Sequence, residues 1–186
     1  MFGFQQAKIT PDIICLSKGI TGGYMTLSTI LTTNNIYDAF YDEYEKLNAF
    51  LHSHSYTANP IACSAANATL DIFKNKNVLK NNKALSKHMK KCFESLRDHP
   101  NISDVRQKGM VLAIELIKDK KRKIAYDWRE RRGIKAYLHG LKNNVLMRPL
   151  GNVLYFMPPY VITKKQISFV SEIMKQGVDE ATKKSS

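Results

Sequence analysis

A lysine stands at the end of a short apolar run, where its chemistry can differ from that of an ordinary surface lysine. Ile13 to Leu16 form the run, and Ser17-Lys18-Gly19 follow with small, nearly uncharged neighbours. An amine that is desolvated at a strand end can have its pKa lowered and attack carbonyl groups, which is the basis of Schiff-base catalysis. On this segment alone, a surface lysine beside a glycine turn remains the favoured alternative.

Hydroxyl and imidazole groups gather in the segment from His52 to Pro60, immediately before a helical pattern. Because Pro60 suits the first turn of a helix, an anionic group such as phosphate can sit at this helix N-terminus. His52 and His54 lack a nearby carboxylate or thiol, so no metal site is expected. A polar, hydrogen-bonded loop that binds nothing is the alternative.

A lone arginine, Arg148, projects from an otherwise apolar segment that precedes Pro149-Leu150-Gly151. Its guanidinium fork matches a carboxylate in bidentate fashion, so it needs either an internal Asp or Glu or the carboxylate of a substrate. Spacing alone favours the internal pair.

The elements that must position these residues follow from apolar periodicity and turn signals. A buried strand is predicted at 13–16, a second strand at 27–32, and a helix that begins at Asn34 or Asn35 and runs through Ile36, Phe40 and Tyr44. The later elements are helices at 60–73, 79–96 and 124–142, strands at 102–107, 110–117, 145–148 and 153–157, a turn over Pro149 to Asn152, and a helix from Lys164 to about Ala181 capped by Thr163.

Composition restricts the class of protein. The 186 residues are 44% hydrophobic and 24% charged, which fits one or two globular domains and excludes disorder, collagen and a coiled coil. There is no apolar run of membrane-spanning length and no signal-peptide pattern, so a cytoplasmic location is expected and no membrane partner. The three cysteines have no Cys-x-x-Cys pair and are expected to be small buried residues.

The net charge of +13 is unevenly distributed, with −2 on residues 1–70 and +15 on the remainder. The basic part contains no zinc finger and no RNP-like aromatic motif. We therefore favour a solvated lysine-rich surface, with no nucleic-acid partner, over specific nucleic-acid binding.

Together these segments resemble a known family. Pro11 to Tyr24, with the lysine in Ser-Lys-Gly-Ile-Thr-Gly-Gly, is similar to the lysine segment of the class III, fold-type-I aminotransferases, which depend on pyridoxal 5'-phosphate. The stretches from His52 to Ala66 and from Arg148 to Tyr160 resemble the branch of that family that acts in biotin biosynthesis. The resemblance implies an α/β fold, with the end of the large cofactor-binding domain over 1–85 and the small α+β C-terminal domain over 86–186.

The resemblance also implies a role for each candidate residue. Lys18 corresponds to the lysine that forms the Schiff base with the cofactor and shuttles the proton between substrate Cα and cofactor C4′. Ser55, with His54 beside it, corresponds to the phosphate-binding hydroxyl that acts across the interface of a homodimer. Arg148 corresponds to the receptor of the carboxylate of 8-amino-7-oxononanoate, with Tyr155 as an aromatic neighbour, and S-adenosylmethionine is the implied amino donor.

Members of the family are more than twice as long as this chain. The resemblance therefore implies a C-terminal portion from a truncated, split or decayed gene, without the Gly-Ser phosphate loop and the aspartate that pairs with the pyridine nitrogen. Catalysis by the chain alone is not expected. The alternatives are another class III ω-aminotransferase, or a non-catalytic remnant that keeps the dimer surface.

Overall fold

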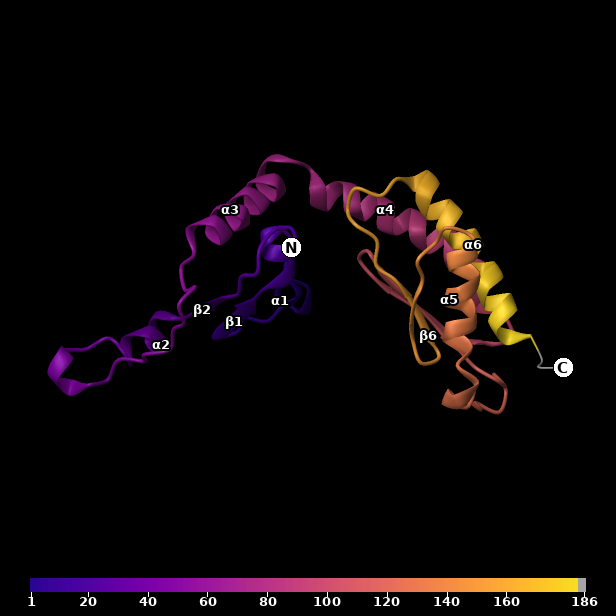
Figure 1. Ribbon diagram of the computed structural model, residues 1–186, viewed down its shortest axis with the longest axis horizontal. Helices are drawn as coiled ribbons and strands as arrows, with labels where there is room; N and C mark the ends of the chain where they lie inside the picture. The colour runs from indigo at the N-terminus through magenta and orange to yellow at the C-terminus, as the bar shows by residue number, and fades with distance from the viewer. Residues whose placement is uncertain (184–186) are drawn as a thin grey trace. The chain divides into compact units, whose positions relative to one another are not determined.

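The computed structural model describes residues 1–183 and divides the chain into two compact units, Met1–Leu79 (unit 1) and a second that begins at Lys80 (unit 2) (Figure 1). Unit 1 contains α1 (Gly3–Ala7), β1 (Ile13–Leu16), the 3₁₀ turn η1 (Lys18–Thr21), β2 (Thr29–Thr32), α2 (Asn34–Asp38), η2 (Tyr44–Lys46) and α3 (Pro60–Asn75). Unit 2 contains most of α4 (Val78–Phe93), then η3 (Glu94–Asp98), β3 (Ile102–Lys108), β4 (Val111–Leu116), η4 (Trp128–Glu130), α5 (Arg132–Lys142), β5 (Arg148–Leu150), β6 (Val153–Phe156) and α6 (Lys164–Thr182).

The first strand forms where it was predicted, but it is not buried. β1 pairs antiparallel with β2, with Ile13 opposite Thr32 and Leu16 opposite Thr29, and no third strand joins this sheet within residues 1–183. Each of the two strands therefore keeps one unpaired edge, and Ile13 is 54% exposed, whereas Ile14 and Leu16 are half-buried. The prediction of a strand was confirmed, and the prediction of its burial was wrong.

The helix expected from Asn34 or Asn35 to Tyr44 is also different. Its N-cap is Thr33, which makes no side-chain capping bond, and α2 ends at Asp38. Phe40 is 46% and Tyr44 86% exposed, so the apolar stripe packs on no core. A short helix without such packing does not propagate in water, which explains its early end.

The helix that begins at Pro60 was predicted correctly. The Asn59 side chain caps α3 by accepting hydrogen bonds from the backbone N–H groups of Ile61 at 3.0 Å and Ala62 at 3.1 Å. Ala62 and Ala66 are its buried residues. The gap between the helices predicted at 60–73 and 79–96 is also present, since α3 ends before Lys76 and α4 begins at Val78.

Unit 2 is built on a four-stranded antiparallel sheet in the order β3-β4-β6-β5. Alternate residues of β4, among them Leu112, Ile114 and Leu116, are buried, as expected for a strand with one face on a core. They form one cluster with side chains of α4, α5 and α6, which lie together beside the sheet in Figure 1. The Thr163 cap predicted for the last helix is confirmed, because its hydroxyl and Gln166 form a capping box.

The helix predicted over 124–142 forms only in its second half, as α5. Ile124 instead bridges to Asp119, and the Asp127 side chain accepts a hydrogen bond from the Arg129 N–H at 2.8 Å. Arg131 then takes a positive φ of 48°, which a helix cannot accommodate. Local side-chain bonds therefore compete successfully with the helix before Arg132.

Two further expectations need correction. The turn expected from Pro149 to Asn152 is shorter, because Pro149 and Leu150 belong to β5 and pair with β6. The cysteines are not buried: Cys15 is exposed, and Cys63 and Cys92 are partly exposed. None of the three forms a disulfide in the part of the chain that is described.

Arg132, which is 5% exposed, holds the end of α6 and had no sequence signal of its own. Its Nη1 donates hydrogen bonds to the carbonyls of Ala181 at 2.9 Å and Lys183 at 2.7 Å. Its Nε and Nη2 both donate to Glu130 Oε2, and the guanidinium lies 4.7 Å from the centre of the Tyr126 ring. The hydrogen bond from Arg132 lowers the pKa of the Glu130 carboxyl below its usual range.

We expect Arg132→Ala to lower the free energy of unfolding of unit 2 by about 3 kcal/mol, since it removes two charge-assisted hydrogen bonds to helix-terminal carbonyls. Thermal unfolding followed by circular dichroism measures the loss. Arg129→Ala is the matched control, because Arg129 is exposed and contacts only its sequence neighbours Asp127 and Trp128 in the described part of the chain. Equal stability of the two variants would contradict the structural role of Arg132.

Candidate functional site

Lys18 begins the 3₁₀ turn that follows β1, and its backbone has the positive φ of 54°. A residue with a Cβ reaches this left-handed region only at a cost of about 1–2 kcal/mol, so the surrounding structure must hold it there. The Lys18 side chain is exposed. The expected desolvation of this amine is therefore not found among residues 1–183, whereas its position at the end of the strand is confirmed.

The lysine segment is positioned by its packing on α3. Thr21 is 1% exposed, and its hydroxyl donates a 2.6 Å hydrogen bond to the Met25 carbonyl. Gly22, with φ +63°, has no Cβ, and a Cβ built there would lie 3.2 Å from Thr69 Oγ1 of α3. Between this turn and α3 lies a hollow of about 680 Å³, lined in part by Thr21, Tyr24 and Ile61.

The anion site expected at the start of α3 is blocked by the side chain of the helix cap. The N–H groups of Ile61 and Ala62 are the donors that such an anion needs, and both already bond the Asn59 side chain. A ligand would have to displace that cap. The polar loop before Asn59 is therefore a separate feature from the helix terminus.

In that loop, Ser55 and His54 remain able to donate outward. Thr57 closes the turn, since its hydroxyl accepts from the His54 N–H at 3.0 Å. The Tyr56 N–H donates to His54 Nδ1 at 3.1 Å, so the neutral ring carries its proton on Nε2. The exposed Ser55 hydroxyl makes no hydrogen bond within the described part of the chain. A hydroxyl and an imidazole N–H are suitable donors to a phosphate.

Arg148 opens β5 directly opposite Tyr155 of β6. Its guanidinium carbon lies 5.3 Å from the centre of the Tyr155 ring, a cation–π contact. The side chain is exposed, and no carboxylate of residues 1–183 pairs with it. The internal partner favoured by spacing is therefore not found, and the fork is open to an external carboxylate.

Gly133 fixes the place of this arginine and had no sequence signal. It lies at the start of α5, and a Cβ there would lie 2.8 Å from Pro149 Cβ and would also collide with the Gly151 carbonyl. Only glycine lets α5 approach the β5–β6 turn this closely. The helix backbone thus supports the strand that carries Arg148.

The predicted residues divide between the two units. Lys18, His54 and Ser55 belong to unit 1, while Arg148 and Tyr155 belong to unit 2. No group of three or more His, Cys, Asp or Glu side chains suitable for a metal occurs among the described residues, which include His52 and His54.

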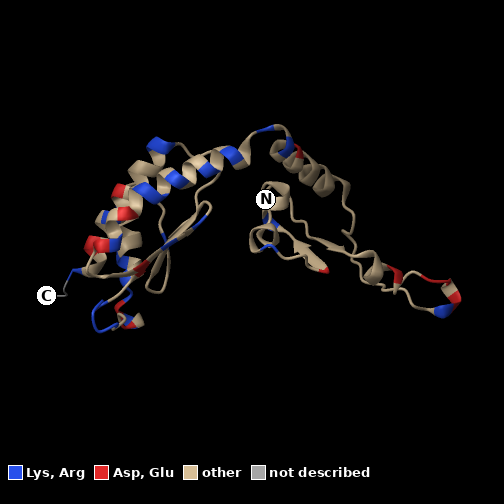
Figure 2. Cartoon of the chain, turned by 180° about the vertical axis from the view of Figure 1, so that it is seen from behind, with Lys and Arg blue, Asp and Glu red and all other residues tan. Residues whose placement is uncertain are grey.

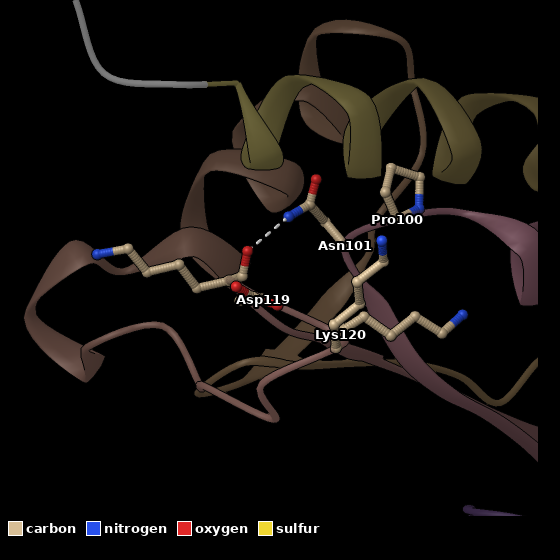
Figure 3. A pocket seen from close by; sticks show the side chains of 6 residues that line it. Pro100, Asn101, Asp119 and Lys120 are labelled. Atoms are coloured by element: carbon tan, nitrogen blue, oxygen red, sulfur yellow. Dashed lines mark hydrogen bonds between the residues drawn. The ribbon is translucent and has the colours of Figure 1, made fainter.

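A second hollow, of about 390 Å³, lies in unit 2 beside Asn101 and the loop from Lys118 to Lys121 (Figure 3). Asn101 Nδ2 donates to the carbonyls of Ile117 and Lys118, both at 3.1 Å, and Lys120 Nζ donates to the Arg97 carbonyl at 2.7 Å. These polar groups hold the loop in place. They do not converge on a common point, so we assign no ligand here.

Comparison with known proteins identifies the family. The family model described as "Aminotransferase class-III" matches residues 1–178. The chain belongs to the class III aminotransferases. The family depends on pyridoxal phosphate, as the resemblance implied.

Two curated class III relatives are named adenosylmethionine-8-amino-7-oxononanoate aminotransferase. That of Helicobacter pylori is 44% identical over 98% of this chain and 41% of its own length, and that of Geobacter sulfurreducens is 39% identical over 98% and 40%. The crystal structure of the enzyme of that name from Methanocaldococcus jannaschii matches with a TM-score of 0.89 at 37% identity, over 95% of this chain and 40% of that one.

The aminotransferase chain thus spans about two fifths of the length of these relatives. The match confirms the mixed α/β fold of a pyridoxal-phosphate-dependent transferase. Within residues 1–183, none of the helices has the length and apolar character needed to cross a membrane. The roles of the five candidate residues and the assignment of 1–85 and 86–186 to a large and a small domain stay predictions.

Proposed function

We propose that this chain provides the cofactor lysine and the substrate arginine of a transaminase that transfers an amino group from S-adenosylmethionine to 8-amino-7-oxononanoate, giving 7,8-diaminononanoate for biotin biosynthesis. The names of relatives at 33–44% identity support this reaction. The observation that carries the proposal is the open guanidinium of Arg148, because this arginine has no carboxylate partner among the described residues and the keto acid substrate has one to offer.

The donor set fits pyridoxal phosphate. Lys18 offers an exposed amine for the carbonyl carbon of the cofactor, and Ser55 and His54 offer a free hydroxyl and an Nε2–H for its phosphate. We assign Ser55 and His54 to the cofactor of a second subunit, which makes the working enzyme a homodimer. When bound, the cofactor supplies the conjugated ring that withdraws electrons from the substrate Cα.

Each residue of the chain then has a defined task. The Lys18 amine holds the cofactor and afterwards moves a proton at the substrate Cα. Arg148 orients the keto acid by a bidentate contact to its carboxylate, and the Tyr155 ring keeps the guanidinium plane in position. We assign residues 1–85 to the large domain, 86–186 to the small domain, and the enzyme to the cytoplasm.

A hybrid enzyme tests this function. The chain replaces the matching part of the Helicobacter pylori relative, and formation of 7,8-diaminononanoate is measured with S-adenosylmethionine as donor. The proposal expects turnover of 8-amino-7-oxononanoate. A hybrid that binds the cofactor and aminates other keto substrates, but not this one, would overturn the substrate assignment.

In the active hybrid, Arg148→Lys is expected to raise the KM for 8-amino-7-oxononanoate at least about tenfold, because a lysine keeps the charge but loses the bidentate fork. The absorbance spectrum of the cofactor should stay normal. Arg106→Lys is the control, since Arg106 is an exposed arginine of the same sheet that pairs with Asp104 and Glu115. An unchanged KM in Arg148→Lys would show that this arginine is structural.

A further inference from the structure

Helix α4 presents a row of lysines that no carboxylate neutralises. Its sixteen residues contain no Asp or Glu, and in Figure 2 it carries blue bands without a red one. Lys83, Lys87, Lys90 and Lys91 are all exposed, while Met89 and Phe93 on the opposite side are fully buried. The helix therefore turns its cationic side to solvent.

The fold adds two more segments to this row. On one flank, the Ser86 hydroxyl donates to the Gly109 carbonyl at 2.8 Å, which places the β3–β4 turn and its exposed Lys108 beside the helix. On the other flank, His88 Nε2 lies 3.2 Å from the Lys164 carbonyl and 2.9 Å from Ser168 Oγ, which places the first turn of α6 there. Lys87 lies between these two attachments.

We call Lys83, Lys87, Lys90, Lys91, Lys108 and Lys164 the lysine face. The ion pairs that lysines make in the described part of the chain belong to Lys46, Lys175 and Lys183, and none involves the lysine face. Six unpaired ammonium groups from three segments attract an extended polyanion, and their neutralisation of its phosphates releases the counterions condensed on it. The first and last of these lysines, Lys83 and Lys164, are more than 80 positions apart in the sequence, so the cluster cannot be recognised from the sequence alone.

We propose that the lysine face binds the phosphate backbone of nucleic acid without sequence preference, which departs from the sequence-based expectation of a solvated surface with no nucleic-acid partner. The part of the lysine face that α4 provides exposes no large apolar side chain between Lys80 and Phe93, and beside Lys108 the single strand partner Val111 is 43% exposed. A protein interface requires aromatic or aliphatic anchors, and a helix lying on a membrane requires an outward apolar side. Contacts to a phosphate backbone require only cations, and this face has no aromatic side chain on α4 that would stack on bases.

The test uses the full 186-residue chain and a fluorescent 20-base-pair DNA duplex, with binding followed by anisotropy over a series of salt concentrations. We expect a dissociation constant of roughly 10⁻⁴–10⁻⁶ M at physiological salt, equal for two unrelated duplex sequences. Lys83→Gln/Lys87→Gln/Lys90→Gln should weaken binding at low salt at least tenfold. It should also reduce the slope of log K against log salt by about 2–3, because three phosphate contacts are lost.

The matched control is Lys118→Gln/Lys121→Gln/Lys123→Gln, which changes the net charge equally at three exposed lysines elsewhere in unit 2. It should bind within twofold of the unchanged chain. Equal weakening of the two triple variants would overturn the proposal, because net charge alone would explain the binding. Binding to anionic phosphatidylserine vesicles with none to the duplex would overturn it as well, and so would a strong preference for one duplex sequence.

Discussion

Replacing Lys18 with arginine in the hybrid enzyme is expected to lower kcat at least about 10³-fold, because it removes the amine that we propose holds the cofactor and carries the proton at the substrate Cα. Arginine is the informative substitution. It keeps the positive charge and the Cβ, so the left-handed backbone at φ 54° experiences the same strain as before. A loss of activity can then be attributed to the missing nucleophile and proton carrier and not to a change in charge or backbone strain.

Reduction with borohydride followed by peptide mapping gives a second measurement. The pyridoxyl group is expected on Lys18 in the hybrid and on no peptide of this chain in Lys18→Arg. Lys8→Arg and Lys46→Arg serve as controls, because both lysines are exposed residues of unit 1 and neither follows a strand directly. A label on Lys8 or Lys46, or full activity of Lys18→Arg, would refute the assignment.

Hydrogen exchange is expected to divide the 186-residue chain between Leu79 and Lys80. The buried residues of unit 1 are few, namely Thr21, Ala62 and Ala66, whereas unit 2 contains a continuous core that includes Phe93, Ile114 and Leu154. An isolated two-stranded sheet is marginal in water, while a domain of about 100 residues is stable by about 5 kcal/mol. Amides of β4 and β6 should therefore be protected about 10³-fold more than those of β1 and β2.

Mass spectrometry of peptic peptides measures this difference. Arg132→Ala is the useful comparison, since it should reduce protection in unit 2 and leave unit 1 unchanged. Equal protection of β1 and β4 would contradict the prediction. It would mean that the two-stranded sheet of β1 and β2 is covered in solution.

Local signals predicted local structure well. Asn59 and Thr163 cap their helices through side-chain bonds that span two or three residues, so the sequence nearby contains all that is needed. The failures are residues whose conformation depends on distant partners. β1 has the apolar composition of a buried strand, but within residues 1–183 its side chains are exposed or at most half-buried. Residues 124–131 lose their helical pattern to bonds made by Asp119 and Asp127.

In the candidate site, too, features set by nearby residues were predictable and features that depend on distant partners were not. The type and neighbours of Lys18 singled it out, whereas its exposure and its left-handed backbone required the structure. Arg148 was a candidate for either an internal or an external partner, and only the contacts around it favour the external one. Gly133 and Arg132 act through segments 18 and 49 positions away, at Gly151 and Ala181, and no pattern along the chain indicates such contacts.

In the proposed enzyme, the length of the two-residue turn between β5 and β6 is expected to affect substrate selection. Gly151, with φ +60°, and Asn152 set the register that places Arg148 opposite Tyr155. A strand that slips by one residue turns every side chain to the other face. Insertion or deletion of a single residue in this turn is expected to move the guanidinium away from the tyrosine and so to disrupt the proposed carboxylate receptor, at a distance from the residue that binds.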